Sequence, residues 1–476
     1  MTDTLSAPTG TPTVFTKPIN VNAYGSVIEI FEEANSRFAD NVAFTNFGQS
    51  LTFKEIDEKS RSVAAYLQNE LGLKKGDRVA IMLPNILAFP VVMFGILRAG
   101  LVQVNVNPLY TPRELKHQLN DADTDTIFVF SGSSATLAEV IADTPVKNVV
   151  IANVGDASGV DLPSPPAHEM FADRATVNDV IAKGEQLDFV PPQINRSDLI
   201  YLQYTGGTTG LSKGAALSHA NLVANVMQFD AATDGFMRAG EEVVITALPL
   251  YHIFALMVNC LSYYWLGSKN VLITNPRDMP AFVAELKKHK LSVITGVNTL
   301  FNGLLHTPGF DELDFSNYKF AMGGGSAIQR AVSDKWKQVT GHHIIEGYGL
   351  SETSPILSVN PFDSTEFTET VGQVMPMTEI KLLDADDNEV PMGQPGELCA
   401  RGPQVMQGYW RKPDATAAVM TPDGFFRTGD IAIMDKRNNF KIVDRKKDMV
   451  LVSGFNVYPA EVEAVIAEIE GVSRSP

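Results

Sequence analysis

Hydrophobic residues in the first part of the chain follow two alternating patterns. Short runs rich in β-branched residues, such as Val79–Leu83 and Thr126–Phe130, have the length and composition of buried strands. Between them lie amphipathic stretches, one of which places Leu115, Leu119 and Ala122 on the same helical face. Repeated strand–helix units predict a parallel sheet that is covered by helices on both faces.

One of these helices has a recognisable start and another a recognisable end. Thr111 precedes Pro112 and is followed by Glu114, which is the pattern of an N-cap, a proline in the first turn and a capping box. A second apolar stripe ends at Gly341, where glycine favours a helix C-terminus. The stripe consists of Ile328, Val332, Trp336 and Val339.

A second series of strand–helix units begins at Asp198, and the pattern changes again near the end of the chain. The expected strands of this series are Leu199–Gln203, Val243–Leu248, Leu291–Gly296, Lys319–Met322 and His343–Glu346. After about Val371 the hydrophobic period becomes two, and turn-forming residues separate short strands. This part is predicted to form a small β-barrel or a curled sheet.

These patterns predict the α/β fold class and an order of domains. We expect a large N-terminal region made of two βα-layered parallel-sheet subdomains, followed by the small β-barrel. The expected divisions are a flexible tail at 1–20, the first α/β subdomain at 21–190, the second at 191–370 and the β-barrel-like part at 371–444.

Two long uncharged runs, Val79–Leu97 and Val243–Ser268, have the length of a membrane span. Pro84 interrupts the first run and Pro249 the second, and each run begins with a β-branched stretch. Each is therefore expected to form a buried strand, a turn and a buried helix. A membrane-spanning protein is the alternative.

Charge and cysteine content exclude several classes of protein. There are 38 lysines and arginines against 55 aspartates and glutamates, which gives a formal net charge of −17. Because this charge repels nucleic-acid phosphates, we expect no nucleic-acid partner. Cys260 and Cys399 are too few for a disulfide framework, and residues 1–20 lack the apolar segment of a signal peptide. We predict a cytoplasmic protein, and leave open peripheral contact at the inner face of the membrane and a homodimer.

Candidate chemistry begins with a glycine-rich segment, Tyr204–Gly214, directly after a predicted strand. It reads Tyr-Thr-Gly-Gly-Thr-Thr-Gly-Leu-Ser-Lys-Gly. Glycines let backbone N–H groups approach a polyphosphate, threonine hydroxyls add donors and Lys213 adds a positive charge. The segment is not a Walker A loop, because Ser212 stands where that loop requires glycine. The simpler alternative is a glycine-rich hairpin turn.

Three consecutive glycines, Gly323, Gly324 and Gly325, lie between a predicted strand and a predicted helix. The Rossmann fingerprint fails there, because Ile328 occupies the position of its third glycine. Two interpretations remain. Either the backbone contacts an adenine ring or an acyl chain closely, or the strand and the helix pack closely together.

Four motifs occur in a fixed order along the chain. They are Tyr204–Gly214, Tyr348-Gly-Leu-Ser-Glu-Thr353, Arg427-Thr-Gly-Asp430 and Asp444-Arg-Lys-Lys-Asp448. Together they resemble the adenylate-forming superfamily, with bacterial long-chain fatty-acid–CoA ligases as the nearest members. Pro249–Phe254 and Val452–Pro459 support the resemblance, which extends from about Tyr24 onward. It implies an acid–thiol ligase that converts a fatty acid and ATP to an acyl-adenylate, releases diphosphate and passes the acyl group to coenzyme A.

The resemblance also implies roles for individual residues. Thr205 and Glu352 would hold Mg²⁺ between the phosphates, with a surface glutamate as the alternative for Glu352. Residues with a part in catalysis would be Lys213, Glu352, His252 and Arg445. The nucleotide would be bound by Tyr204, Thr205, Gly206, Gly207, Thr208, Thr209, Gly210, Lys213, Gly325, Gly347, Tyr348, Thr353, Asp430 and Arg445.

Within that set, three side chains have more specific expected contacts. Asp430 would accept hydrogen bonds from both ribose hydroxyls, since a carboxylate has two acceptor oxygens. Arg445 would add a cation near the ribose and the α-phosphate, and Tyr348 would stack on the adenine. Without the family, Thr-Gly-Asp is a common turn and Asp-Arg a common surface pair.

The acid to be activated would lie near His252. A lone histidine in an apolar stretch is usually a hydrogen-bonded core residue, but this position matches a family histidine beside the substrate carboxylate. We expect it to orient or gate the substrate, because a carboxylate is already ionised at neutral pH and needs no base. The acyl chain would occupy an apolar tunnel. Its expected lining is Tyr251, His252, Phe254, Met257, Asn298, Thr299, Gly323, Gly324 and Gly325.

The end of the chain departs from the family. Its members continue with a mobile α+β domain that follows a hinge matching 445–448 and carries a lysine needed for adenylation. Only the start of that domain is expected at 449–476, and no candidate lysine follows Glu461. We therefore expect a truncated form with impaired turnover. The alternatives are a non-catalytic ATP- and acyl-binding module, or a ligase for aromatic or medium-chain acids.

Overall fold

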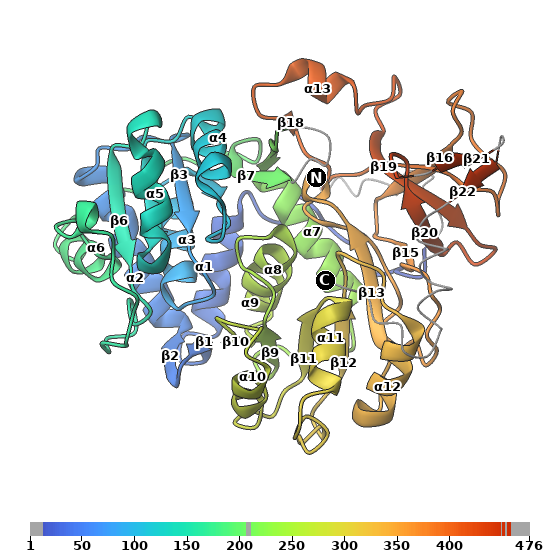
Figure 1. Cartoon of the computed structure of the whole chain (residues 1–476), viewed down its shortest axis with the longest axis horizontal. Coiled ribbons are helices and arrows are strands. Elements are labelled where there is room, and N and C mark those ends of the chain that lie inside the picture. Colours follow the sequence, from blue (N-terminus) through green and yellow to red (C-terminus); the bar gives the residue numbers. More distant parts are fainter. Residues whose placement is uncertain (1–12, 206–210, 449, 453–454, 458–476) are drawn as a thin grey trace.

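The computed structural model describes residues 13–205, 211–448, 450–452 and 455–457. Two large mixed sheets with flanking helices make up most of the molecule, and a smaller antiparallel sheet follows them (Figure 1). In Figure 1 the strands β3 and β6 lie at the left in blue and teal, and the small sheet lies at the right in orange to red.

The first large sheet has seven strands in the order β18-β8-β7-β4-β3-β5-β6. Strands β3 to β7 run parallel to one another, whereas β8 and β18 pair antiparallel at the β7 edge of the sheet. The strands that were predicted here are confirmed. The seven strands of this sheet, of which β8 and β18 were not predicted, are β3 Arg78–Met82, β4 Val102–Asn105, β5 Thr126–Phe130, β6 Asn148–Ala152, β7 Leu199–Thr205, β8 Lys213–Ser218 and β18 Gly408–Tyr409.

The second large sheet has nine strands in the order β15-β14-β13-β12-β11-β9-β10-β1-β2. Its centre is parallel, and β2, β14 and β15 pair antiparallel at the edges. The bounds are β1 Val42–Asn46, β2 Gln49–Thr52, β9 Val243–Thr246, β10 Lys269–Leu272, β11 Val293–Gly296, β12 Phe320–Gly323, β13 Ile344–Gly349, β14 Ile356–Val359 and β15 Gln373–Val374.

The two sheets exchange strands across the division expected at residue 190. Strand β1 precedes that residue but pairs with β10 of the second sheet, and β7 follows it but pairs with β4 of the first. A division by sequence position therefore does not separate the sheets. The physical reason is that hydrophobic period identifies a strand, whereas its neighbour is chosen by long-range packing.

Helices cover the sheets, and the predicted start of α4 and the predicted end of α12 are confirmed, although Ile328 of the predicted stripe lies before α12. Thr111 caps α4 and forms a reciprocal capping box with Glu114, while Gly341 ends α12 with a φ of 86°. The helices are α1 Val27–Arg37, α2 Phe53–Asn69, α3 Ala88–Arg98, α4 Pro112–Ala122, α5 Ser134–Val140, α6 Val177–Gly184, α7 His219–Ala232, α8 Ile253–Met257, α9 Tyr263–Trp265, α10 Met279–Leu286, α11 Asn298–Leu305, α12 Arg330–Thr340 and α13 Pro413–Ala417. Shorter turns are the 3₁₀ segments η1 Ser131–Ser133, η2 Ile141–Asp143, η3 Glu169–Phe171 and η5 Ser351–Thr353, and the π-helical η4 Val258–Ser262.

Both uncharged runs fold as a strand followed by buried helix, as predicted. The first contains most of β3 and α3, and the second runs from β9 through α8, η4 and α9. Within the described ranges, no helix has both the length and the apolar character needed to cross a membrane.

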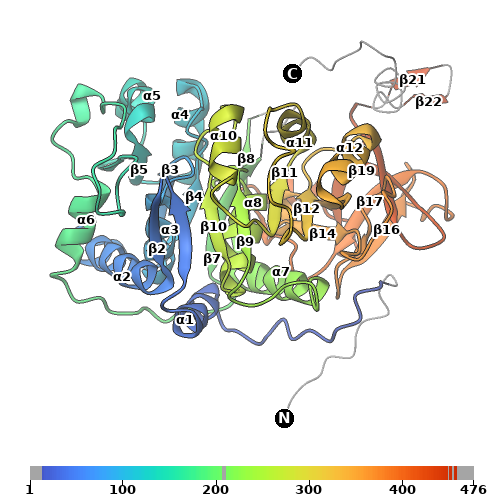
Figure 2. The same cartoon turned by 90° about the horizontal axis from the view of Figure 1, so that it is seen from below.

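The period-two part of the chain forms a four-stranded antiparallel sheet in the order β16-β17-β19-β20. Its strands are β16 Glu379–Leu383, β17 Gly396–Arg401, β19 Phe426–Met434 and β20 Phe440–Arg445. It corresponds to the small barrel or curled sheet of the sequence prediction, and Figure 2 shows it beside the end of the second large sheet. The hairpin of β21 Val450–Val452 and β22 Phe455–Val457 follows 445–448. The expected helix beyond it lies outside the described residues.

A buried ion cluster joins the first three helices. Every residue of α3 is buried, including Arg98, which is only 2% exposed. The Arg98 guanidinium donates to Ser60 Oγ at 3.1 Å and to Glu32 Oε1 at 2.9 Å, and it also pairs with Asp57. A charge so far from water requires such partners, because desolvation is otherwise very costly.

We expect Asp57→Ala to lower the free energy of unfolding by about 3 kcal/mol, because it leaves the buried guanidinium underpaired. Glu58→Ala on the same helix is the control, since Glu58 is exposed and its contact with Lys54 is 4.0 Å long. The midpoint of urea unfolding measures both variants. Equal shifts in the two would contradict the importance of the cluster.

Candidate active site

The glycine-rich segment connects two antiparallel strands. Thr205 at the end of β7 stands opposite Lys213 at the start of β8. The predicted ligands Gly206, Gly207, Thr208, Thr209 and Gly210 lie outside the described residues. The segment therefore joins two paired strands, as the hairpin alternative expects. This does not exclude the phosphate-loop hypothesis, because the same pairing sets Lys213 opposite Thr205.

Tyr204, another predicted nucleotide ligand, is turned toward helix α4. Its hydroxyl donates to Asp121 Oδ2 at 2.8 Å, and its ring lies against Gly214, where an added Cβ would stand 3.0 Å from Tyr204 Cε2. Burial and the Asp121 carboxylate raise the pKa of Tyr204 above its usual range. The side chain thus braces the end of β7 against α4.

Glu352 is buried in η5 and does not belong to the surface, so the surface alternative is wrong. Only 7% of the residue is exposed, and Oε1 accepts a 2.8 Å hydrogen bond from the hydroxyl of Tyr409 on β18. The ammonium nitrogen of Lys213 lies 5.1 Å from the centroid of the Tyr409 ring. Burial raises the pKa of Glu352, while the Tyr409 hydrogen bond and the Lys213 charge favour the ionised carboxylate.

Asp430 and Tyr348 meet on the small sheet side of the same site. The Tyr348 hydroxyl donates to Asp430 Oδ2 at 2.6 Å, and Arg445 Nε lies 3.9 Å from Asp430 Oδ1 across the β19–β20 pair. Burial raises the pKa of Asp430, and the Tyr348 hydrogen bond opposes this shift. The Asp430 charge also raises the pKa of Glu352, so the two carboxylates lie within electrostatic range of each other.

Thr353 and the glycines of the site have local structural roles. The Thr353 hydroxyl accepts from Leu350 N at 3.0 Å and donates to Pro355 O, which fixes the turn that holds Glu352. An added Cβ at Gly347 would lie 3.1 Å from Met322 Cε. The side of Gly347 that faces the sheet is therefore closely packed.

The three consecutive glycines differ from one another. An added Cβ would lie 2.8 Å from Ile328 at Gly323 and 3.1 Å from the Phe254 ring at Gly324. Gly325 is exposed and has a φ of 76°, which favours glycine. Close packing thus accounts for Gly323, whereas Gly325 is accessible to a ligand.

His252 caps α8 through Nδ1, which accepts from Phe254 N at 3.3 Å. The residue is exposed to solvent at the start of α8. Desolvation lowers the pKa of His252, which favours the neutral imidazole. A packed core histidine would be buried, so the exposed His252 does not fit the core-residue alternative.

The other residues predicted to line the acyl tunnel lie on α8, just before α8 and on α11. Phe254 and Met257 are buried in α8, while Tyr251 is half-buried and accepts at its carbonyl from Gln203 Nε2 at 3.1 Å. Asn298 Oδ1 accepts from Gln329 N at 2.9 Å, and the neighbouring Thr299 is exposed. The tunnel itself stays a prediction.

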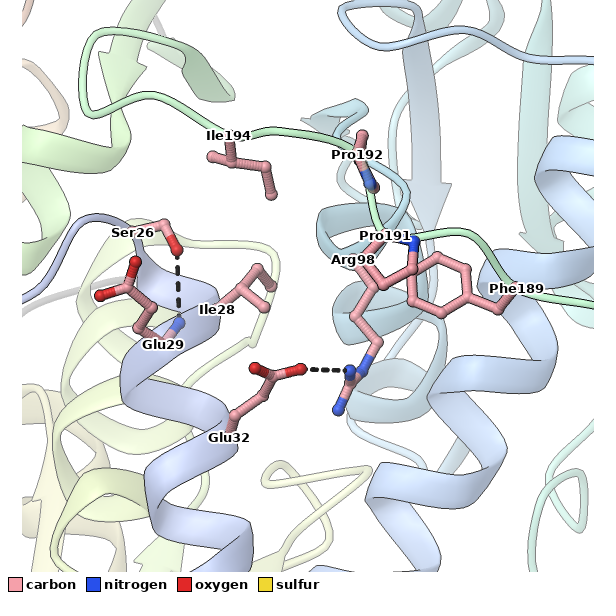
Figure 3. Close-up of a pocket in the computed structure, with 9 residues that line it drawn as sticks. All are labelled: Ser26, Ile28, Glu29, Glu32, Arg98, Phe189, Pro191, Pro192 and Ile194. Carbon is pink, nitrogen blue, oxygen red and sulfur yellow. Dashed lines mark hydrogen bonds and ion pairs between the residues drawn. The ribbon is translucent and has the colours of Figure 1, made fainter.

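The pocket drawn in Figure 3 lies elsewhere, between α1, the end of α3 and segment 189–194. Glu32 and Arg98 pair with each other across it, and Glu29 Oε2 accepts from Gly25 N at 2.7 Å. The carboxylates of Glu32 and Glu29 therefore already have hydrogen-bond donors. The pocket is separate from the candidate active site.

Two functional candidates were missed by the sequence analysis. Tyr409 follows Gly408 in a short aromatic segment, and only the fold brings it to Glu352. Glu346 is a charged residue in the otherwise apolar end of β13, and such a carboxylate could have been flagged as unusual. Glu346 Oε1 accepts from Ile328 N at 2.9 Å, which ties the segment after Gly325 to the sheet.

Glu346 supplies a pH-dependent term in stability. Burial raises the pKa of its carboxyl to about 7 from 4.5, and the charge of Glu369 adds to the shift. Between these values the folded state holds a proton that the unfolded state has lost. Its contribution to stability is therefore full below about pH 4.5 and is lost as the pH rises through about 7.

We expect the thermal midpoint to fall less between pH 5 and pH 7.5 in Glu346→Gln than in the unmodified chain. Glutamine keeps an acceptor for Ile328 N but does not titrate. The carboxyl can contribute a slope of up to about 1.4 kcal/mol per pH unit. Identical pH profiles for the two chains would show that Glu346 does not titrate in this range.

Known proteins are similar to this chain over most of its length. Residues 31–410 match the AMP-binding enzyme family. The chain is 50% identical to a long-chain-fatty-acid–CoA ligase of Escherichia coli O6:H1, over 96% of this chain and 83% of that protein. It is 35% identical to the protein of that name in Bacillus subtilis strain 168, over 94% and 81%.

The fold is shared with solved structures. The crystal structure of ATP-bound MatB from Rhodopseudomonas palustris superimposes with a TM-score of 0.79 at 27% identity, covering 94% of this chain and 84% of that one. The predicted α/β fold class and the predicted family are both confirmed. The chain is a member of the AMP-binding enzyme family.

Proposed function

We propose that this chain is a long-chain fatty-acid–CoA ligase that forms AMP and diphosphate. The observation that carries the proposal is a pair of contacts within one motif region: Tyr409 links Lys213 to Glu352, and Tyr348, four residues before Glu352, binds Asp430. Relatives at up to 50% identity over nearly the whole chain carry that name.

The first half-reaction requires a nucleotide and a carboxylate in line. One carboxylate oxygen attacks the α-phosphorus, and the bond from that phosphorus to the departing diphosphate breaks. Lys213 would neutralise charge on the phosphates, and Arg445 would do so near the α-phosphate. Such fixed charges lower the barrier because they need no reorganisation during the reaction.

Asp430 and Tyr348 would orient the nucleoside. Asp430 Oδ2 accepts the hydrogen bond from the Tyr348 hydroxyl. The other oxygen, Oδ1, faces Arg445 and would accept from a ribose hydroxyl. Because Tyr348 fixes the carboxylate, its direction is set before the nucleotide binds. We infer that this arrangement recognises the ribose.

The donor set fits Mg²⁺. Glu352 offers a carboxylate and Thr205 a hydroxyl, and hard oxygen ligands of this kind suit that ion. Within the described ranges no group of three or more acidic, histidine or cysteine side chains could hold a metal alone. This agrees with an ion whose remaining ligands are substrate phosphates and water, and when bound it would neutralise phosphate charge.

His252 would orient the fatty acid and not accept a proton. Its pKa is lowered, and a carboxylate substrate is already ionised at neutral pH. In the second half-reaction the coenzyme A sulfur attacks the acyl carbon and the bond to AMP breaks. The thiol proton leaves to solvent.

Diphosphate release and acyl-CoA formation across a series of acids test the proposal. Hexadecanoate should support both, and benzoate or 4-coumarate should support neither. Equal rates with aromatic acids would favour an aryl ligase. ATP binding without any diphosphate release would favour a non-catalytic binding module.

We expect Glu352→Gln to weaken binding of ATP in Mg²⁺ by roughly tenfold or more, since a charged contact is lost while the shape is kept. Fatty-acid binding should persist. Calorimetric titration with α,β-methylene-ATP measures the effect, and Glu366→Gln, which alters an exposed carboxylate, is the control. An unchanged dissociation constant would remove Glu352 from the site.

Asp430→Ala is expected to cost about 1–3 kcal/mol of ATP binding through lost charged hydrogen bonds. The unmodified chain should bind ATP more tightly than 2′-deoxy-ATP, and the variant should bind the two nucleotides equally. Competition titrations compare them. If the variant still prefers ATP, the ribose is recognised by another residue.

A further inference from the structure

Helix α4 touches both ends of the connection between β7 and β8. His117 Nε2 lies 2.8 Å from the carbonyl oxygen of Ser212, directly before β8. Asp121 accepts the 2.8 Å hydrogen bond from Tyr204, the second-last residue of β7. The two side chains are one helical turn apart, so they project from the same face of α4.

The atoms at these contacts define the hydrogen-bond direction. A carbonyl oxygen only accepts, so His117 must carry a proton on Nε2. The neutral Nε2–H tautomer and the imidazolium both satisfy the contact. It is therefore independent of the charge on the ring.

The helix is firmly attached to the first sheet and can serve as a fixed platform. Leu115 and Leu119 are fully buried, and Gln118 Nε2 donates to Asn105 O at 2.7 Å. The Thr111 cap stabilises the first turn. Groups held by α4 are thus held relative to the sheet.

Asp121 has a second partner, which leads to the other side of the candidate site. Its Oδ1 pairs with the ammonium of Lys412, and Arg411 Nη2 lies 3.1 Å from Asp123 Oδ2. The same segment begins with Tyr409, whose hydroxyl binds Glu352 and whose ring faces Lys213. One helix face therefore anchors both Tyr204 and the segment that holds Glu352.

We propose that His117 and Asp121 are positioning residues for nucleotide binding, acting through Ser212, Tyr204 and Lys412. This rests on the proposed function only in that the bound nucleotide is ATP. Neither residue needs to contact the nucleotide. They set the places of Lys213 and Glu352, which would.

Direct nucleotide binding to the full chain tests the proposal. Titration with α,β-methylene-ATP in Mg²⁺ should show a dissociation constant raised about three- to tenfold in His117→Ala, as expected for one lost hydrogen bond. His117→Gln, whose amide can donate to Ser212 O, should return the constant to within about twofold. Asp121→Asn keeps an acceptor for Tyr204 but loses the Lys412 ion pair, and it should weaken binding to a similar extent.

Lys116→Ala is the matched control, because Lys116 lies beside His117 but is exposed and pairs with Asp143. It should leave nucleotide binding unchanged. In diphosphate-release assays, His117→Ala should raise KM for ATP while KM for the fatty acid and kcat stay near their original values.

Unchanged nucleotide affinity in both His117→Ala and Asp121→Asn would overturn the proposal. So would a His117→Ala variant that loses fatty-acid and nucleotide binding together and is not rescued by glutamine, since that is the result of general misfolding. If the unmodified chain binds nucleotide but activates no acid, the proposed function fails. The nucleotide affinities of the His117 and Asp121 variants still decide whether these residues position the site. A chain that binds no nucleotide overturns both.

Discussion

The Tyr409 hydroxyl donates to the buried carboxylate of Glu352, and this contact joins segments that are far apart in the sequence. A carboxylate in this position is costly unless hydrogen bonds or a positive charge stabilise its ionised form. Tyr409 supplies the hydrogen bond, and its ring faces the Lys213 ammonium. The placement of Glu352 and Lys213 therefore depends on β18 being docked at the edge of the first sheet.

The pairing of β18 with β8 sets Tyr409 beside Glu352 and Lys213. Strand β18 pairs with β8, and Trp410 N donates to Gly214 O at 2.8 Å just beyond the pair. On the other side, Asp430 and Arg445 stand opposite each other on β19 and β20 of the small sheet. Tyr409 thus links η5 to the first sheet and Tyr348 links β13 of the second sheet to Asp430 of the small sheet, so changes at either contact should alter nucleotide binding.

Local sequence signals predicted the elements well because their causes are local. The Thr111 capping box, the Gly341 terminus and the alternation of strands with amphipathic helices each depend on a few neighbouring residues. The motifs that contain Glu352 and Asp430 were recognised from sequence, and the structure places both carboxylates in one region. Their roles toward a ligand remain predictions.

What the sequence did not predict depends on contacts between distant segments. The pairing of β1 with β10, the addition of β18 to β8 and the contact of Tyr409 with Glu352 are decided by tertiary packing, which no local pattern records. Glu346 was missed because a single carboxylate in an apolar strand has no meaning until its partner, Ile328 N, is known.

In the proposed reaction, the carboxylate of a fatty acid attacks the α-phosphorus of ATP at this site. Transfer of ¹⁸O from labelled hexadecanoate to AMP tests it most directly, because the attacking oxygen stays on phosphorus when the thiol displaces AMP. AMP released during acyl-CoA formation should carry one ¹⁸O from the carboxylate. Unlabelled AMP, or label found in diphosphate, would contradict it.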